Sequence, residues 1–231
     1  MSFLRTLFRK TSLALVAGLG LAGATHAEGW EGSYVSLGLG KSRSQVDWVA
    51  GGDIIFALPG YQSSGEDSGL AYGVELGQMM RRGNLLLGWS VGLSSLDHDE
   101  TIDSPLFAGD TFSTKIGPVF TIAGRVGQDV GDWMFYGETG LALAKLDVPN
   151  ETPFCPTACR VSLDGVSAGL MAGLGADYRL SDRWSVGVNY RYIGFRDRTA
   201  TGMVSGMMAP QAYEVGGEAS VLTLRLTAAL N

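Results

Sequence analysis

The sequence is poor in the residues that most often build catalytic and metal sites. Only 2 cysteines and 2 histidines occur among 231 residues. A metal site needs several ligands of this kind close together, and neither cysteine has a histidine near it in the sequence. We therefore expect no metal, no cofactor and no catalytic residues.

Long apolar runs and basic residues are also scarce. Beyond residue 27, no segment approaches the roughly 20 consecutive apolar residues of a transmembrane helix. The chain has 17 Lys and Arg against 23 Asp and Glu. Because three of the basic residues lie in the first 27 positions, the remainder has 14 basic and 23 acidic residues, a net charge of −9. This balance argues against a nucleic-acid partner, which requires clustered Lys and Arg.

The first 27 residues are typical of a cleaved signal peptide. A basic segment precedes an apolar run, and small residues that suit a cleavage site follow the run. These parts are Arg5, Arg9 and Lys10, then residues 11–24, then Thr25-His26-Ala27. The alternative is an uncleaved membrane anchor, for which the run is short. We expect a signal peptide over residues 1–27 and one mature domain over residues 28–231.

What the chain has in abundance is alternation of apolar and polar residues, most clearly in residues 173–195. From Trp184 to Tyr192, apolar side chains take every second position, with Ser, Gly, Asn and Arg between them. A period of two indicates a strand with two different faces. A soluble sandwich would bury the apolar face, whereas a membrane barrel turns it toward lipid. An exported, apolar chain without helix-length runs can enter a membrane only as a barrel, because backbone groups in lipid must be paired within the structure.

Eight alternating segments follow the signal peptide, and the connections between them alternate in length. The segments are 33–42, 69–80, 84–95, 113–128, 133–146, 165–179, 183–196 and 217–230. Tight connections follow the second, fourth and sixth segments, and long ones the others, as in even-stranded outer-membrane barrels. We predict an all-β fold, an eight-stranded antiparallel up-and-down transmembrane β-barrel with both termini in the periplasm; a soluble all-β sandwich is the alternative. Pro118 cannot donate to a strand ladder, so we expect it at a bulge or at the barrel rim.

If the apolar faces point to lipid, the positions between them face the lumen. Three acidic and three basic side chains are expected there: Glu75, Arg125, Glu138, Asp177, Arg191 and Arg225. Unpaired charges in a confined lumen are costly, whereas a paired network is tolerated. Since side chains can fill the interior of eight strands, we predict a barrel closed by its own salt bridges. A charge-lined or gated small pore is the alternative.

Two further groups of side chains are expected on the outer surface. The first is an aromatic girdle at the membrane boundary, formed by Trp133, Phe135, Tyr178, Trp184 and Tyr192. The second lies near the external rim, where lipopolysaccharide phosphates would be, and comprises Lys145, Arg196 and Arg198. We predict that these basic residues contact lipopolysaccharide.

The external loops contain the two other features that suggest chemistry. Cys155 and Cys159 lie in a long loop of an exported protein, so we predict a disulfide, with a modest and local effect on stability. His98 lies among acidic residues near Ser94 and Ser95, and lipid-modifying outer-membrane barrels use histidine and serine at their rim. We favour a solvated acidic loop over such a site, which would need an oriented base and a serine within reach.

Several stretches resemble a known family. Residues 121–127, 133–142 and 175–195 are similar to the small outer-membrane β-barrel (porin-like) family of α-proteobacteria, the surface-protein group typified by the 25 and 31 kDa Brucella antigens. The opening Gly29-Trp-Glu-Gly-Ser-Tyr-Val35 resembles the family's usual mature start. The resemblance covers the barrel framework from end to end, but not the loops.

The chain departs from this family at three places. Asn189 stands where the family usually has glutamate, and Gly187 lies where a basic residue is usual. Family members usually end in an aromatic residue that the barrel-assembly machinery reads, whereas this sequence ends Ala229-Leu230-Asn231.

The resemblance implies an outer-membrane location and a largely structural or surface-interaction role, exerted through the external loops. Its implied partners are outer-membrane lipid, lipopolysaccharide, the barrel-assembly machinery and a host or envelope ligand at the loops. A narrow porin for small solutes is the alternative function, and a lipid-modifying enzyme at His98 is the third. Kinship of fold alone does not choose among them.

Overall fold

β-Strands form almost all of the computed structural model, which describes residues 29–51, 60, 62–96, 98–103, 111–147, 150–151, 161–162, 165–204 and 209–230. The strands are β1 (Gly32–Ala50), β2 (Gln62–Arg82), β3 (Leu85–Ser95), β4 (His98–Asp103), β5 (Thr111–Val130), β6 (Trp133–Asp147), β7 (Asn150–Glu151), β8 (Val161–Ser162), β9 (Val166–Arg179), β10 (Trp184–Val204) and β11 (Ala209–Ala229). In this part of the chain, no helix is long and apolar enough to cross a membrane.

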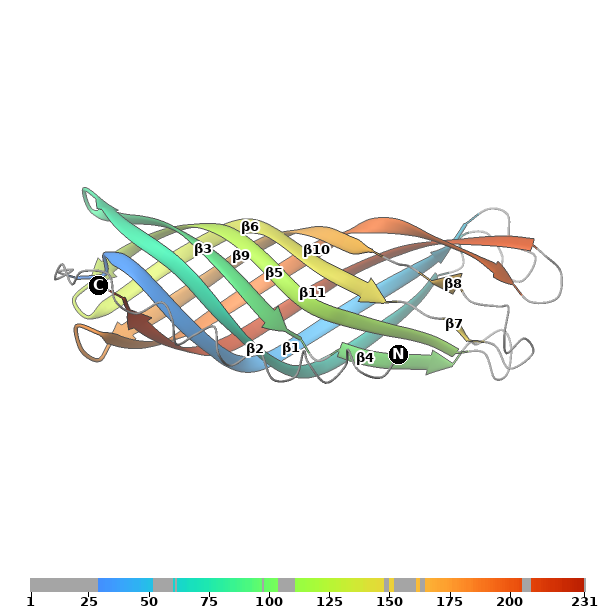
Figure 1. The fold of residues 1–231 in the computed structure, drawn as a ribbon, viewed down its shortest axis with the longest axis horizontal. Helices are drawn as coiled ribbons and strands as arrows, with labels where there is room; N and C mark the ends of the chain where they lie inside the picture. The colour runs from blue at the N-terminus through green and yellow to red at the C-terminus, as the bar shows by residue number, and fades with distance from the viewer. Residues whose placement is uncertain are drawn as a thin grey trace, which may run out of the picture.

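Eight long strands close into a ring (Figure 1). Around the ring they follow the order β1, β2, β3, β5, β6, β9, β10 and β11, each antiparallel to the next, and β11 pairs with β1. At this seam the register runs from Tyr34 opposite Ala229 to Ala50 opposite Tyr213. The short strands β4, β7 and β8 extend the wall beside β5 and β10. The predicted eight-stranded antiparallel up-and-down barrel is confirmed, and the soluble sandwich is wrong.

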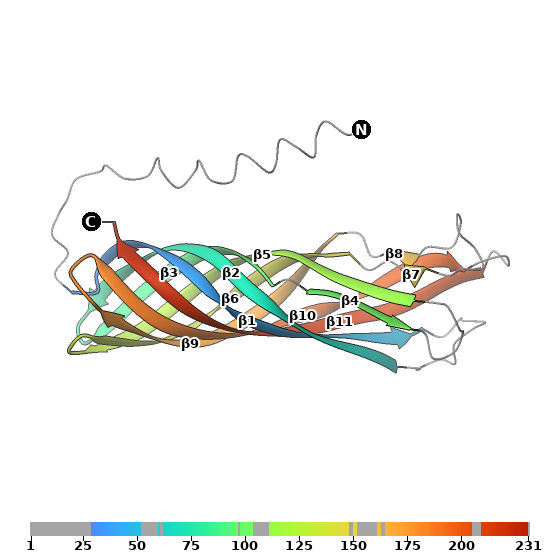
Figure 2. The ribbon, with the colours of Figure 1, turned by 90° about the horizontal axis from the view of Figure 1, so that it is seen from below.

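The three tight turns lie together at one end of the barrel, which we call the turn end; the opposite end is the loop end (Figure 2). Gly83 and Gly131 have φ angles of 63° and 61° in the first two turns, a left-handed conformation that glycine adopts without strain. In the third turn, the Leu180 N–H donates to the Trp184 carbonyl at 2.9 Å and the Trp184 N–H donates to Ser181 Oγ at 3.1 Å. All three predicted tight connections are therefore confirmed.

Several strands continue further toward the loop end than the sequence predicts. β1 reaches Ala50, β10 reaches Val204 and β11 begins at Ala209, so these strands have 19 to 21 residues. Alternation fades there because outward positions such as Arg43 and Asp47 are polar, although the backbone pairing of β1 with β11 continues. A tilted strand crosses a bilayer in about 9–11 residues, so the wall projects well beyond the membrane.

Two bulges interrupt the wall. In β5 the register with β6 shifts between Ile116 and Val119, and Pro118 lies within this shift. A bulge leaves a residue outside the ladder, which accommodates a side chain that has no N–H to donate. The position expected for Pro118 is thus confirmed. A second shift separates Phe195 from Arg198 in β10, opposite β11.

The outward face of the ring carries an apolar band. On β10, apolar side chains are exposed at every second position from Trp184 to Tyr192, a span that matches the length of a membrane-crossing strand. Leu222, Leu224 and Leu226 continue the band on β11. Apolar side chains exposed in this pattern face lipid rather than water.

The lumen is filled in three layers. Toward the turn end, the turn-end apolar layer comprises Tyr34, Met79, Leu86, Met134 and Tyr136, with Trp30 packed against it. Charged side chains follow in the middle. Toward the loop end, the loop-end apolar layer comprises Val46, Trp48, Ala71, Leu96, Ile116, Val119, Ala123, Ala142, Ala144, Met171, Ile193, Phe195, Val215, Ala219 and Val221.

Inward glycines make room for the two tyrosines of the turn-end apolar layer. A Cβ at Gly77 would overlap the Tyr34 side chain, and a Cβ at Gly175 would overlap the ring of Tyr136. Each ring therefore lies across the neighbouring strand where that strand has no side chain. This arrangement directs both tyrosine hydroxyls toward the charged layer.

Candidate functional site

Five charged side chains from five strands meet at one level of the lumen, and we call them the ion-pair layer. Glu75 comes from β2, Arg125 from β5, Glu138 from β6, Arg191 from β10 and Arg225 from β11. Strand alternation points all five inward, and the register places Arg125 directly opposite Glu138. Arg191 is partly buried and the other four are buried. The predicted lumen network is therefore present for these five residues.

Glu75 is the carboxylate that all three arginines share. Its Oε1 accepts from Arg125 Nη2 at 2.8 Å and from Arg225 Nη2 at 2.9 Å. Its Oε2 pairs with Arg191, and the Tyr34 hydroxyl donates to Oε1 at 3.2 Å. Both oxygens of this buried carboxylate are thus occupied, which offsets the cost of removing it from water.

Glu138 joins two of the same arginines from the opposite wall. Its Oε2 accepts from Arg125 Nη2 at 2.7 Å, and its Oε1 accepts from Arg191 Nε at 2.6 Å. Asn189 Nδ2 also donates to Oε1 at 3.0 Å. Asn189, at the position where related barrels were expected to carry glutamate, therefore supplies a neutral donor to the layer.

The tyrosines and a serine complete the surroundings of the arginines. The guanidinium carbon of Arg125 lies 4.4 Å from the ring centroid of Tyr136 and 5.5 Å from that of Tyr34, within the range of cation–π attraction. Arg225 donates to the Tyr136 hydroxyl at 2.7 Å and to Ser36 Oγ at 2.8 Å. A buried charge network of this kind is tolerated because each ion has several partners.

Asp177, the sixth residue predicted for the network, is in the lumen but outside these bonds. It is only 2% exposed, and the register places it opposite Met134 and Gly187, toward the turn end. Its Oδ1 has no hydrogen-bond partner among the described residues. The ion-pair layer has three arginines and two glutamates, so an ionised Asp177 would balance the remaining positive charge without a direct ion pair.

The loop-end apolar layer fills the lumen at a second level. The sequence analysis does not predict this layer. Its signal was present in β6, where Leu141-Ala142-Leu143-Ala144 is apolar on both faces. Ala142 and Ala144 are buried inside the barrel, while Leu141 and Leu143 face outward. A small cavity of about 50 Å³ separates this layer from the ion-pair layer.

The aromatic residues predicted for a girdle lie at two levels. Trp133 contacts Phe135 and Tyr178 with ring centroids 6.0 Å and 5.0 Å apart, and these residues lie with Trp184 near the turn end. Tyr192 lies at the other boundary of the apolar band on β10. The five residues therefore divide between the two edges of the band, four at one edge and Tyr192 at the other.

Two of the three basic residues predicted at the external rim are exposed. Lys145 and Arg196 face outward on β6 and β10. Arg198 is half-buried and donates to the Val166 carbonyl at 3.3 Å. Lys145 also lies opposite Val166, in the β6–β9 register. Lys145 and Arg198 therefore flank the start of β9.

The chemical features predicted in the loops fall outside the described residues. Cys155, Cys159 and the side chain of His98 belong to this group, and the backbone of His98 pairs with Ile116 at the start of β4. Their disulfide and rim-site hypotheses stay predictions. Trp30 lies at the turn end, packed against the turn-end apolar layer. The sequence analysis singles it out only as part of the motif Gly29–Val35.

A closed antiparallel ring with an apolar outer band and a charged, filled interior defines an integral outer-membrane β-barrel. The family model described as "Outer membrane protein beta-barrel domain" matches residues 11–217. The chain belongs to this family, and its location is the cell outer membrane.

Three solved structures are similar to the chain at low sequence identity. Neisserial surface protein A (NspA) is 12% identical, over 87% of this chain and 99% of that one, with a TM-score of 0.43. The attachment invasion locus protein Ail of Yersinia pestis is 12% identical, over 84% and 99%, with a TM-score of 0.37. The outer membrane protease OmpT of Escherichia coli is 9% identical, over 85% and 96%, with a TM-score of 0.52. Likeness at such identities concerns the fold alone, and no curated protein sequence matches the chain.

Proposed function

We propose that this protein is a non-enzymatic surface protein, in which a closed barrel holds the external loops as the working surface. The observation that carries this proposal is the double closure of the lumen. The ion-pair layer fills one level with buried, mutually bonded side chains, and the loop-end apolar layer fills the next. A solute would have to cross both, so the arrangement favours a structural barrel over the narrow porin.

The length of the wall supports the same role. β10 and β11 each have 21 residues, about twice the number that crosses a bilayer. The loop-end tips of these two strands therefore lie away from the lipid surface, toward other molecules. We propose that a ligand on a host cell or in the envelope binds there.

Single-channel conductance of the refolded protein in a planar bilayer tests the closed-barrel proposal. We expect no current steps from the natural protein. We also expect none from Arg125→Ala, because the loop-end apolar layer stays intact in this variant. Heat-modifiable gel mobility checks that each sample is folded. Regular steps from the natural protein would overturn the proposal and make the narrow porin the first hypothesis.

We also propose that the outer-membrane lipid around the barrel includes lipopolysaccharide bound through Lys145, Arg196 and Arg198. The exposure of the first two, close to the loop-end edge of the apolar band, supports this contact. A triple alanine variant should bind lipopolysaccharide more weakly than the natural protein. An alanine variant of Arg82 and Arg183, exposed basic residues at the turn end, is the control. Equal binding by all three proteins would refute the contact.

The finer family membership is a proposal as well. We infer that the chain is a member of the α-proteobacterial group typified by the Brucella surface antigens, on the strength of residues 121–127, 133–142 and 175–195.

The absence of enzymatic activity is tested at His98, the residue that would act as the base of a lipid-modifying site at the rim. His98→Ala should leave the mass spectrum of lipid A unchanged relative to the natural protein, whereas a lost modification would establish an enzyme.

A further inference from the structure

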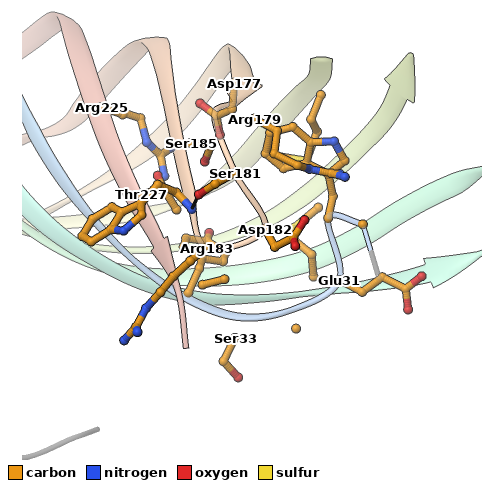
Figure 3. A pocket seen from close by; sticks show the side chains of 18 of the residues that line it. Glu31, Ser33, Asp177, Arg179, Ser181, Asp182, Arg183, Ser185, Arg225 and Thr227 are labelled. Carbon is orange, nitrogen blue, oxygen red and sulfur yellow. Dashed lines mark hydrogen bonds between the residues drawn. The ribbon is translucent and has the colours of Figure 1, made fainter. Parts of the chain in front are cut away.

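A small pocket opens at the turn end of the lumen, beneath the ion-pair layer. It has a volume of about 50 Å³, and Trp30, Asp177, Ser185 and Arg225 are among the residues that line it. Figure 3 shows Asp177, Ser185 and Arg225 together at one end of the pocket, while the side chain of Arg183 points away from it. In outer-membrane barrels the end with short turns faces the periplasm, so the pocket is open to periplasmic solutes.

Trp30 and Asp177, which both line this pocket, each have a buried polar atom, and the two atoms have opposite hydrogen-bonding character. Asp177 Oδ1 is an acceptor and Trp30 Nε1 is a donor, and neither has a hydrogen-bond partner among the described residues. Asp177 is 98% buried, since only 2% of its surface is exposed. Buried polar atoms are usually hydrogen-bonded, and leaving a charged one without a partner is costly. The pair therefore indicates a ligand that can both donate and accept.

Charge narrows the chemistry of that ligand. A cation would satisfy Asp177 but would leave the Trp30 N–H without an acceptor, and it would lie near Arg125 and Arg225, which also line the pocket. An anion would accept from Trp30 but would face the Asp177 carboxylate. A neutral hydroxyl group both donates and accepts, so it meets both requirements without adding charge.

We propose that this pocket binds a terminal hydroxymethyl group of a polyhydroxy ligand, a sugar or a sugar alcohol. Hydroxyls of the ligand donate to Asp177 Oδ1 and accept from Trp30 Nε1. One water needs roughly 10–15 Å³ of such a cavity, so this pocket takes the end of a small polyol and the remainder lies in its mouth. The ligand is either a free periplasmic solute or the end of a periplasmic glycan, and both present this chemistry.

Indole N–H signals in a two-dimensional NMR spectrum provide the test. The refolded protein is kept in a zwitterionic detergent that has no sugar headgroup, and it is titrated separately with glycerol, glucose and a soluble glycan fragment. The chain has 5 tryptophans, and a Trp30→Phe variant identifies the Trp30 signal. We expect this signal to shift with a dissociation constant on the order of 1 mM, as befits a few contacting atoms. Binding of the small polyols indicates a free solute, and binding of the fragment alone indicates a glycan end; both support the proposal.

Variants decide whether the pocket is responsible. Asp177→Leu should weaken binding by about tenfold or more, since it removes a charged acceptor, and Asp132→Asn at another turn should leave affinity unchanged. If Asp177→Leu does not give the heat-modifiable folded form, calorimetry on Trp30→Phe decides instead, with an expected loss of about threefold or more. No shift of the Trp30 signal with any of the three ligands would overturn the proposal. Unchanged affinity in the variant that folds would do so too.

Discussion

Glu75→Gln should destabilise the barrel strongly, because one arginine has its ion pair, among the described residues, only with this carboxylate. Arg125 and Arg191 retain Glu138 as an ion-pair partner after the substitution. Arg225, at 5% exposure, has an ion pair only with Glu75 among the described residues. Breaking one buried pair costs about 3–5 kcal/mol. We expect a loss of about this size in the free energy of unfolding, and not three times as much, since one arginine and not three is left without a direct ion pair.

Urea unfolding in detergent micelles, followed by the heat-modifiable gel shift, measures this loss. Glu66→Gln is the matched control, because Glu66 pairs with Arg43 on the exposed outer wall and exposed pairs contribute little. The double variant Glu75→Gln/Arg225→Met should lose less than the sum of the single variants, since it also removes the stranded charge. A loss below about 1 kcal/mol for Glu75→Gln would show that the ion-pair layer is not needed for stability.

Three further predictions address the packing, the double closure and the loop. Gly175→Ala should lower the free energy of unfolding by about 1–3 kcal/mol, since its methyl group would displace Tyr136; Gly137→Ala, with room for a Cβ, should change it little in the same urea experiment. Adding Ile193→Ser to Arg125→Ala removes a buried side chain from each closed level, so this double variant should produce current steps in a planar bilayer where each single variant is silent. The disulfide predicted in the external loop should appear as alkylation of both cysteines only after reduction, detected by the mass of the intact protein.

The fold and most of the ion-pair layer were predictable because they depend on regular periodicities. Alternation assigns Glu75, Arg125 and Glu138 to the inward face, and their distances from the tight turns place them at a similar depth. Neither inference needs side-chain conformations. The sequence could not show that Asp177 stays outside the bonded network, because an offset of a few ångströms along β9 decides whether its carboxylate reaches an arginine.

Three features were not predicted: the full length of the strands, the loop-end apolar layer and the tyrosine partners of the arginines. They depend on strands whose two faces have the same polarity, or on partners far apart in the sequence. Where the wall projects beyond the membrane, its outward face is polar and alternation no longer marks the strand. The predicted segment 33–42 is therefore shorter than β1, which continues to Ala50. The loop-end apolar layer was missed because Ala142 and Ala144 look like ordinary members of an apolar strand. The use of Tyr34 and Tyr136 as partners of the arginines depends on glycines in neighbouring strands, which periodicity in one strand does not show.

The seam between the first and last strands makes completion of the barrel an all-or-none event. Ser36 Oγ and Thr227 Oγ1 lie 2.6 Å apart although 191 positions separate them, and Arg225 reaches Glu75 across 150 positions. Until β11 arrives, β1 has an unpaired edge and Glu75 lacks one of its cations. Contacts of such long range also slow folding. A chain interrupted before its last strand would therefore lack both the partner of β1 at the seam and the arginine that β11 contributes to the ion-pair layer.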